Sequence, residues 1–84
     1  MAYDPQIAVI HSASAQLTAL SGVPPRVIDE DGAVRIETPV TAALLRHWTR
    51  AIPVFYLGTD FGLTDTASGR VVWVRFELGK GACP

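Results

Sequence analysis

The sequence predicts an α+β fold: one small domain with the order α-β-β-α-β-β, a mostly antiparallel four-stranded sheet and two helices packed on one face. Two stretches, 26–37 and 54–78, alternate apolar and polar residues around a turn, which is typical of β-hairpins. Two others, 5–21 and 39–50, carry apolar residues at helical spacing. The 84 residues suffice for one domain, 1–84, and we expect the Gly-rich end 79–84 to be a flexible tail.

The first helix is predicted to begin at Asp4-Pro5. Aspartate supplies an N-cap oxygen, and proline at the first helical position loses only an N–H that has no helical partner. Gly22 stands where a glycine ends a helix. The apolar positions at helical spacing are Ile7, Ile10, Ala13, Leu17 and Leu20.

The first hairpin is centred on Asp31-Gly32, a strong signal for a two-residue turn. With these two residues as the loop, Val27 faces Ile36 across the strands and Arg26 faces Glu37. The prolines at 24 and 25 make the preceding connection extended. The acidic run 29–31 lacks the ligand spacing of a calcium loop, so we interpret it as a solvated turn.

The second helix is expected to start at Thr38-Pro39, to run to about Arg50 and to be ended by Pro53. It should lie on the sheet with its apolar face inward. That predicted face consists of Leu44, Leu45, Trp48 and Ile52.

The second hairpin, from Val54 to Leu78, turns around the segment 65–69. If Asp65 pairs with Arg70, the apolar residues of the two strands face each other. The predicted apolar pairs are Leu63 with Val72, Phe61 with Val74 and Leu57 with Leu78. The same register predicts an ion pair of Asp60 with Arg75 and places the indole of Trp73 over Gly62.

Catalytic, metal and cofactor sites are not predicted. His11, His47 and Cys83 are too far apart in sequence for the short paired spacings of a zinc site, and the lone cysteine has no disulfide partner. We therefore expect a protein that is not an enzyme and needs no cofactor. No basic n-region precedes Arg26, and the apolar run 51–57 is too short to span a membrane, so a cytoplasmic location is expected.

The predicted function depends on the second hairpin's outer face, which carries bulky residues where strands facing water normally carry small polar ones. Tryptophan, tyrosine and arginine are enriched in binding hot spots. We expect a protein-interaction module that binds a protein partner or itself, with a homodimer and edge-to-edge strand pairing as one form. An alternative is that the N-terminal helix covers this face. The predicted binding residues are Tyr56, Val71, Trp73 and Arg75.

A DNA-binding regulator is the alternative function. The 39–50 helix followed by a hairpin resembles the arrangement of a winged module, with the helix entering the major groove. The net charge of −1 argues against binding held by many phosphate contacts. The residues that would serve this function are Arg46, His47, Arg50 and Arg70.

Overall fold

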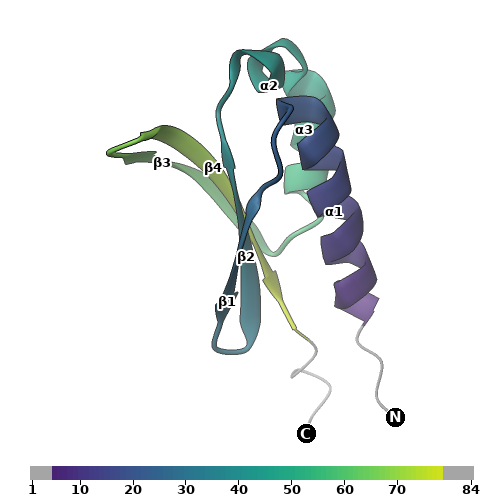
Figure 1. Cartoon of the computed structure of the whole chain (residues 1–84). Helices are drawn as coiled ribbons and strands as arrows, with labels where there is room; N and C mark the ends of the chain where they lie inside the picture. The colour runs from purple at the N-terminus through teal and green to yellow at the C-terminus, as the bar shows by residue number, and fades with distance from the viewer. Residues whose placement is uncertain (1–4, 79–84) are drawn as a thin grey trace, which may run out of the picture.

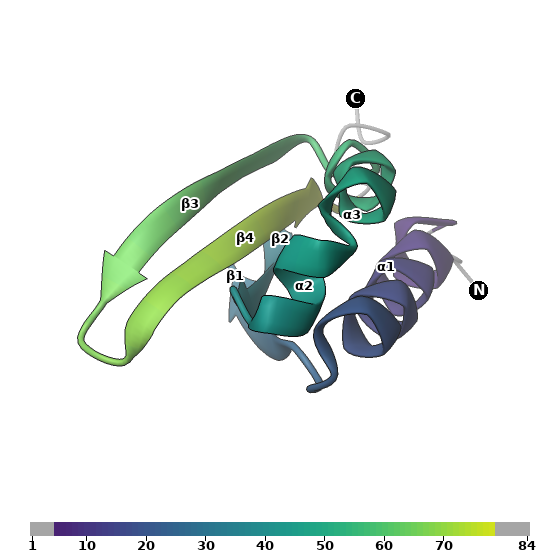
Figure 2. The ribbon, with the colours of Figure 1, turned by 90° about the horizontal axis from the view of Figure 1, so that it is seen from above.

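The computed structural model describes residues 5–78 and confirms the α+β domain with a four-stranded antiparallel sheet (Figure 1). The strands lie in the order β1-β2-β4-β3. All the helices of the described range lie on one side of the sheet, and its other face is open (Figures 1 and 2). The elements are α1 (Pro5–Ser21), β1 (Arg26–Glu30), β2 (Ala33–Pro39), α2 (Ala42–Arg46), α3 (Trp48–Phe55), β3 (Asp60–Thr66) and β4 (Gly69–Glu77).

Helix α1 begins at Pro5 and ends at Ser21, as predicted. Gly22 follows with a φ of +86°, a left-handed conformation that favours glycine, and its N–H donates to the carbonyl of Thr18 at 2.9 Å. The helix packs on the same side as α2 and α3, so the alternative in which it covers the other face is wrong (Figure 2). Asp4, its expected N-cap, and the expected tail 79–84 lie outside the described residues.

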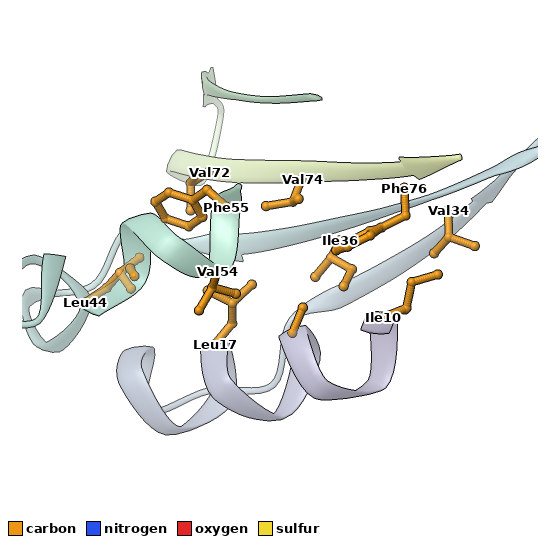
Figure 3. Close-up of a cluster of buried hydrophobic side chains, with 12 residues drawn as sticks. Ile10, Leu17, Val34, Ile36, Leu44, Val54, Phe55, Val72, Val74 and Phe76 are labelled. Carbon is orange, nitrogen blue, oxygen red and sulfur yellow. The ribbon is translucent and has the colours of Figure 1, made fainter. Parts of the chain in front are cut away.

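The core lies between the helices and the inner face of β2 and β4 (Figure 3). Ile36 and Leu17 are fully buried there, as are Val74 and Phe76 of β4. Both hairpin registers agree with the expected ones: Val27 faces Ile36, and Phe61 faces Val74. A one-residue slip would turn the buried side chains of Ile36 and Val74 to the open face, so their burial fixes the register.

The segment between β2 and β3 corrects the sequence-based expectation. The predicted single helix 39–50 does not start at Thr38-Pro39, because both residues belong to β2; it begins at Ala42 with Thr41 as the N-cap. It is also interrupted at His47, and its second part, α3, continues through Pro53 to Phe55. Val54 and Phe55 are both buried, at 2% and 1% exposure. Adjacent strand residues point to opposite faces, so only a helix can bury both against one layer. Leu45 and Ile52, expected on the inner face, are instead exposed.

The second hairpin is therefore shorter than predicted, because β3 begins at Asp60 rather than Val54. Leu57 lies before the strand and does not pair with Leu78, whose N–H donates to the carbonyl of Gly32 at 3.0 Å. The outer part of the β3–β4 hairpin extends beyond the helix layer (Figure 2). We call this hairpin, residues 60–77, the arm.

Candidate functional site

The open face of the sheet holds three of the four predicted binding residues: Val71, Trp73 and Arg75 follow one another at every second position of β4. The indole of Trp73 lies over Gly62 of β3, as predicted. A Cβ at position 62 would come within 2.8 Å of the ring, so glycine is what permits this close approach. Trp73 is half-buried by this packing.

Arg75 belongs to a charge network that the sequence did not predict. It lies opposite Arg35 of β2, a like-charge pair that would be unfavourable alone. Glu30 of β1 lies between them: Arg75 Nε donates to its Oε1 at 3.1 Å, and Arg35 Nε lies 3.5 Å from its Oε2. Arg75 Nη1 also donates to Glu77 at 3.1 Å. Hydrogen bonds to Glu30 and then to Glu77 raise the pKa of Arg75 above its ordinary value.

The predicted ion pair between Asp60 and Arg75 is wrong, although the two residues do face each other in the register. The guanidinium turns instead to the carboxylates of Glu30 and Glu77. The carboxylate of Asp60 accepts the N–H of Phe61 at 3.0 Å. The sequence missed this network because Glu30 and Arg75 lie 45 residues apart and meet only through the strand order.

Tyr56, the fourth predicted binding residue, does not lie on the open face with Trp73. It follows α3 as the C-cap residue, and its ring meets Phe61 edge to face with the centroids 5.0 Å apart. Phe61 lies on the helix side of the sheet, opposite Val74. Tyr56 therefore packs against a second surface of the arm, on the side that the helices cover only in part.

This second surface is apolar and exposed to water. Tyr56 is 69% exposed, Leu63 53% and Phe61 38%, and we call these three residues the arm patch. Phe61 also stacks on the buried Phe55, with the ring centroids 5.7 Å apart, so the patch is anchored in the core. Leu57, in the connection before β3, is a further exposed apolar residue at 43%. The sequence signal was present in the alternation of Phe61 and Leu63, which was interpreted as a core-facing pattern.

Two residues of the arm patch, Phe61 and Leu63, belong to β3, which is an edge strand (Figure 2). Hydrogen bonds fix which of its peptide groups face outward. The N–H of Val40 donates to the carbonyl of Arg70 at 2.9 Å, so the even-numbered residues of β4 turn their peptide groups towards β2. The odd-numbered residues of β4 therefore turn towards β3, where their partners are even-numbered. The peptide groups of Phe61, Leu63 and Asp65 consequently point to the free edge.

The helical residues of the DNA-binding alternative do not belong to one continuous helix. Arg46 is the last residue of α2, His47 stands between the two helices and Arg50 belongs to α3, so no single recognition helix carries them. Arg70 lies at the far end of the arm, in an ion pair with Asp65 at 2.8 Å. The hydrogen bond and the charge of Asp65 raise the pKa of Arg70.

Residues 5–78 contain no group of three or more histidine, cysteine, aspartate or glutamate side chains placed to hold a metal ion. Within the same range no helix has the length and apolar character needed to cross a membrane. A shallow hollow of about 280 Å³ lies at one end of the open face; it is lined by Pro24, Arg26, Glu37, Pro39, Thr66, Ser68 and Val71.

Comparison of the chain with protein-family models, curated proteins and solved structures finds no match, so its function has to be inferred from its own surfaces.

Proposed function

We propose that this domain is a small, non-enzymatic protein-interaction module that binds through its arm. The observation that carries the proposal is the coincidence of two features on β3: the exposed arm patch and the free strand edge beside it. Either feature alone is common on protein surfaces. Together they are what a domain needs to accept an additional β-strand from a protein.

A partner strand would contact side chains on both faces of the arm. A strand added beside β3 forms main-chain hydrogen bonds with the outward peptide groups of Phe61, Leu63 and Asp65, which supply affinity without selecting a sequence. Its alternate side chains then contact Phe61 and Leu63 on one face. On the other face they approach the indole of Trp73 where it lies over Gly62. Specificity therefore comes from apolar side chains at every second position of the partner strand.

The charge network supports placing the contact at β3 rather than across the whole open face. The guanidinium groups of Arg35 and Arg75 already have carboxylate partners in Glu30, Glu37 and Glu77. These paired charges remain hydrated at the surface. A partner that covered them would have to remove this water, which costs free energy. The arm patch has the opposite character, because covering it removes apolar surface from water.

Site-specific photocrosslinking in the native host tests the proposal. A benzophenone amino acid at position 63 should give a covalent adduct with a protein under irradiation. The same amino acid at position 19, which is exposed on α1, is the matched control and should give none. Equal labelling from both positions, or no adduct from position 63, would contradict a binding function for the arm.

A further inference from the structure

We infer that the strand added to β3 is β3 of a second copy of this chain, in antiparallel register with Gly62 facing Gly62 of that copy. This inference deepens the proposed function and rests on it. It follows from a comparison of the two sheet edges, from the direction of the peptide groups along β3, and from the order of side chains along that strand.

The two edges of the sheet differ in how well they are protected. Edge strand β1 has five residues and follows Pro25, which has no N–H to offer. The same hydrogen-bond pattern leaves Val27 and Asp29 as the outward residues of β1, so one of its two outward residues carries a carboxylate. Charges and prolines are the usual means of preventing strand addition. Strand β3 is longer and contains no proline, and its one outward carboxylate, Asp65, lies near the turn and is paired with Arg70 at 2.8 Å. The edge beside the arm patch is therefore the less protected one.

The direction of the peptide groups limits the possible registers. Two copies can pair only if outward residues face outward residues, so odd-numbered positions of one β3 must face odd-numbered positions of the other. Centring the pair on position 63 places Phe61 opposite Asp65, and centring it on position 61 places Leu63 opposite Thr59. Centring it on Gly62 places Phe61 of each copy opposite Leu63 of the other. Only this last register pairs both apolar residues with apolar residues.

The same register is compatible with the charged and aromatic groups of the arm. Asp60 faces Thr64 of the second copy and Asp65 faces Thr59, so no two carboxylates are opposed. The charge of Asp65 is already paired with Arg70 at 2.8 Å. At the centre two glycines face each other, which leaves room for the indole of Trp73 from each copy to meet above them. The N–H of Phe61 exchanges its contact with Asp60 Oδ1, at 3.0 Å, for the carbonyl of Leu63 of the second copy.

The small size of the domain is a reason to expect that this pairing stabilises it. A chain of 84 residues can bury only about 60–65% of its unfolded surface, so its own core gives modest stability. Joining two sheets edge to edge makes a continuous sheet of twice the width, with the helices of both copies on one side. The arm patches of the two copies then lie next to each other and cover apolar surface that is exposed in the single chain.

Disulfide crosslinking between mixed chains tests the register directly. In a Cys83→Ser background, chains carrying Asp60→Cys are mixed with chains carrying Thr64→Cys and oxidised. Positions 60 and 64 face each other as a non-hydrogen-bonded pair with Cα atoms about 4.5 Å apart, which suits a disulfide. The mixture should form a covalent dimer. Either variant alone should not form one. In a dimer of two identical variant chains the two thiols are four residues apart along the strands, which is about 13 Å.

A second pair of variants is the matched control. Asp60→Cys mixed with Thr66→Cys reports the register centred on position 63 and should crosslink at least tenfold less. Preferential crosslinking of this control pair would overturn the inferred register. Leu63→Pro removes one outward N–H on an edge strand, a position where proline is tolerated, and should give a monomer with an unchanged far-UV spectrum.

Light scattering separates failure of this inference from failure of the proposed function. The unmodified chain should have twice its monomer mass of 9.0 kDa, and the photocrosslinked adduct from position 63 should have the mass of two chains. A 9.0 kDa particle at high concentration, together with an adduct of another mass, would overturn self-pairing and retain the protein-binding function. A monomer with no adduct would overturn both.

Discussion

Two threonines near the end of β2 should respond with opposite signs to the same substitution. Thr38 is fully buried on the helix side of the sheet, and within residues 5–78 its hydroxyl has no hydrogen-bond partner. Thr41 lies three residues later, and its hydroxyl has two partners. It donates to the carbonyl of Ser21 at 2.8 Å and accepts the N–H of Leu44 at 3.1 Å, which caps α2.

Thr38→Val should stabilise the fold by about 1–2 kcal/mol. A buried polar group without a hydrogen bond costs about 1–3 kcal/mol, and valine has nearly the same shape without that group. The added methyl also contributes up to about 0.8 kcal/mol of apolar burial. Thr41→Val should instead destabilise by about 0.5–2 kcal/mol, because it removes the N-cap of α2 and leaves the carbonyl of Ser21 without its donor.

Urea unfolding followed by far-UV circular dichroism measures both effects. The m-value should stay constant while the midpoint moves up for Thr38→Val and down for Thr41→Val. In thermal unfolding, each kcal/mol corresponds to about 4–8 °C for a domain of this size. All chains should be compared at one concentration, because association makes stability concentration-dependent. A neutral or destabilising Thr38→Val would show that the hydroxyl has a partner, such as a buried water, and would refute the reasoning.

Three further predictions test separate features. Gly22→Ala should cost about 1 kcal/mol in urea unfolding through backbone strain alone, because its φ is +86° and nothing lies within 4 Å of the added methyl; no loss would show that the helix end relaxes. Gly62→Ala should destabilise when Trp73 is present and much less after Trp73→Val, with a coupling of at least about 0.5 kcal/mol in a double-mutant cycle; strict additivity would mean that the ring moves aside freely. The hydrogen bond and charge of Arg70 lower the pKa of Asp65 below 3.8, so its stabilising effect is complete above about pH 4 and is lost as the pH falls through the lowered pKa. Carboxyl NMR shifts should show this midpoint, and Arg70→Gln should return it towards 3.8.

The sequence predicted the fold class and both hairpin registers because the local signals agreed with the burial of alternate residues in β2 and β4. Asp31-Gly32 fixed one turn, and the alternation from Phe61 to Leu63 and from Val72 to Phe76 fixed the other. The segment around Val54 was assigned wrongly because a short apolar run fits a strand and a buried helix equally well. Proline at position 53 favoured ending the helix, yet α3 tolerates it inside.

The candidate site was only partly predictable. Val71, Trp73 and Arg75 share the open face because they alternate on one strand, which is a local pattern. Tyr56 was separated from them by the helix that replaced the start of the predicted strand. The exposure of Leu63 depends on how far the helix layer reaches across the sheet, and that is a property of packing rather than of local sequence. The same holds for the role of Glu30, which follows from the strand order.

The arm is joined to the rest of the sheet only through β4, so its tip is less stable than the core and can unfold locally. Strand β3 is hydrogen-bonded to β4 alone, and its outer residues contribute no fully buried side chain. The tip can therefore open while Ile36 and Phe76 stay packed against the helices. In native-state hydrogen exchange, amides near the turn at Ser68 should exchange by local fraying, whereas those of Ile36 and Phe76 should need global unfolding. Where a second copy is bound, protection should spread outward along β3, so that association is recorded as slowed exchange in the least stable part of the fold.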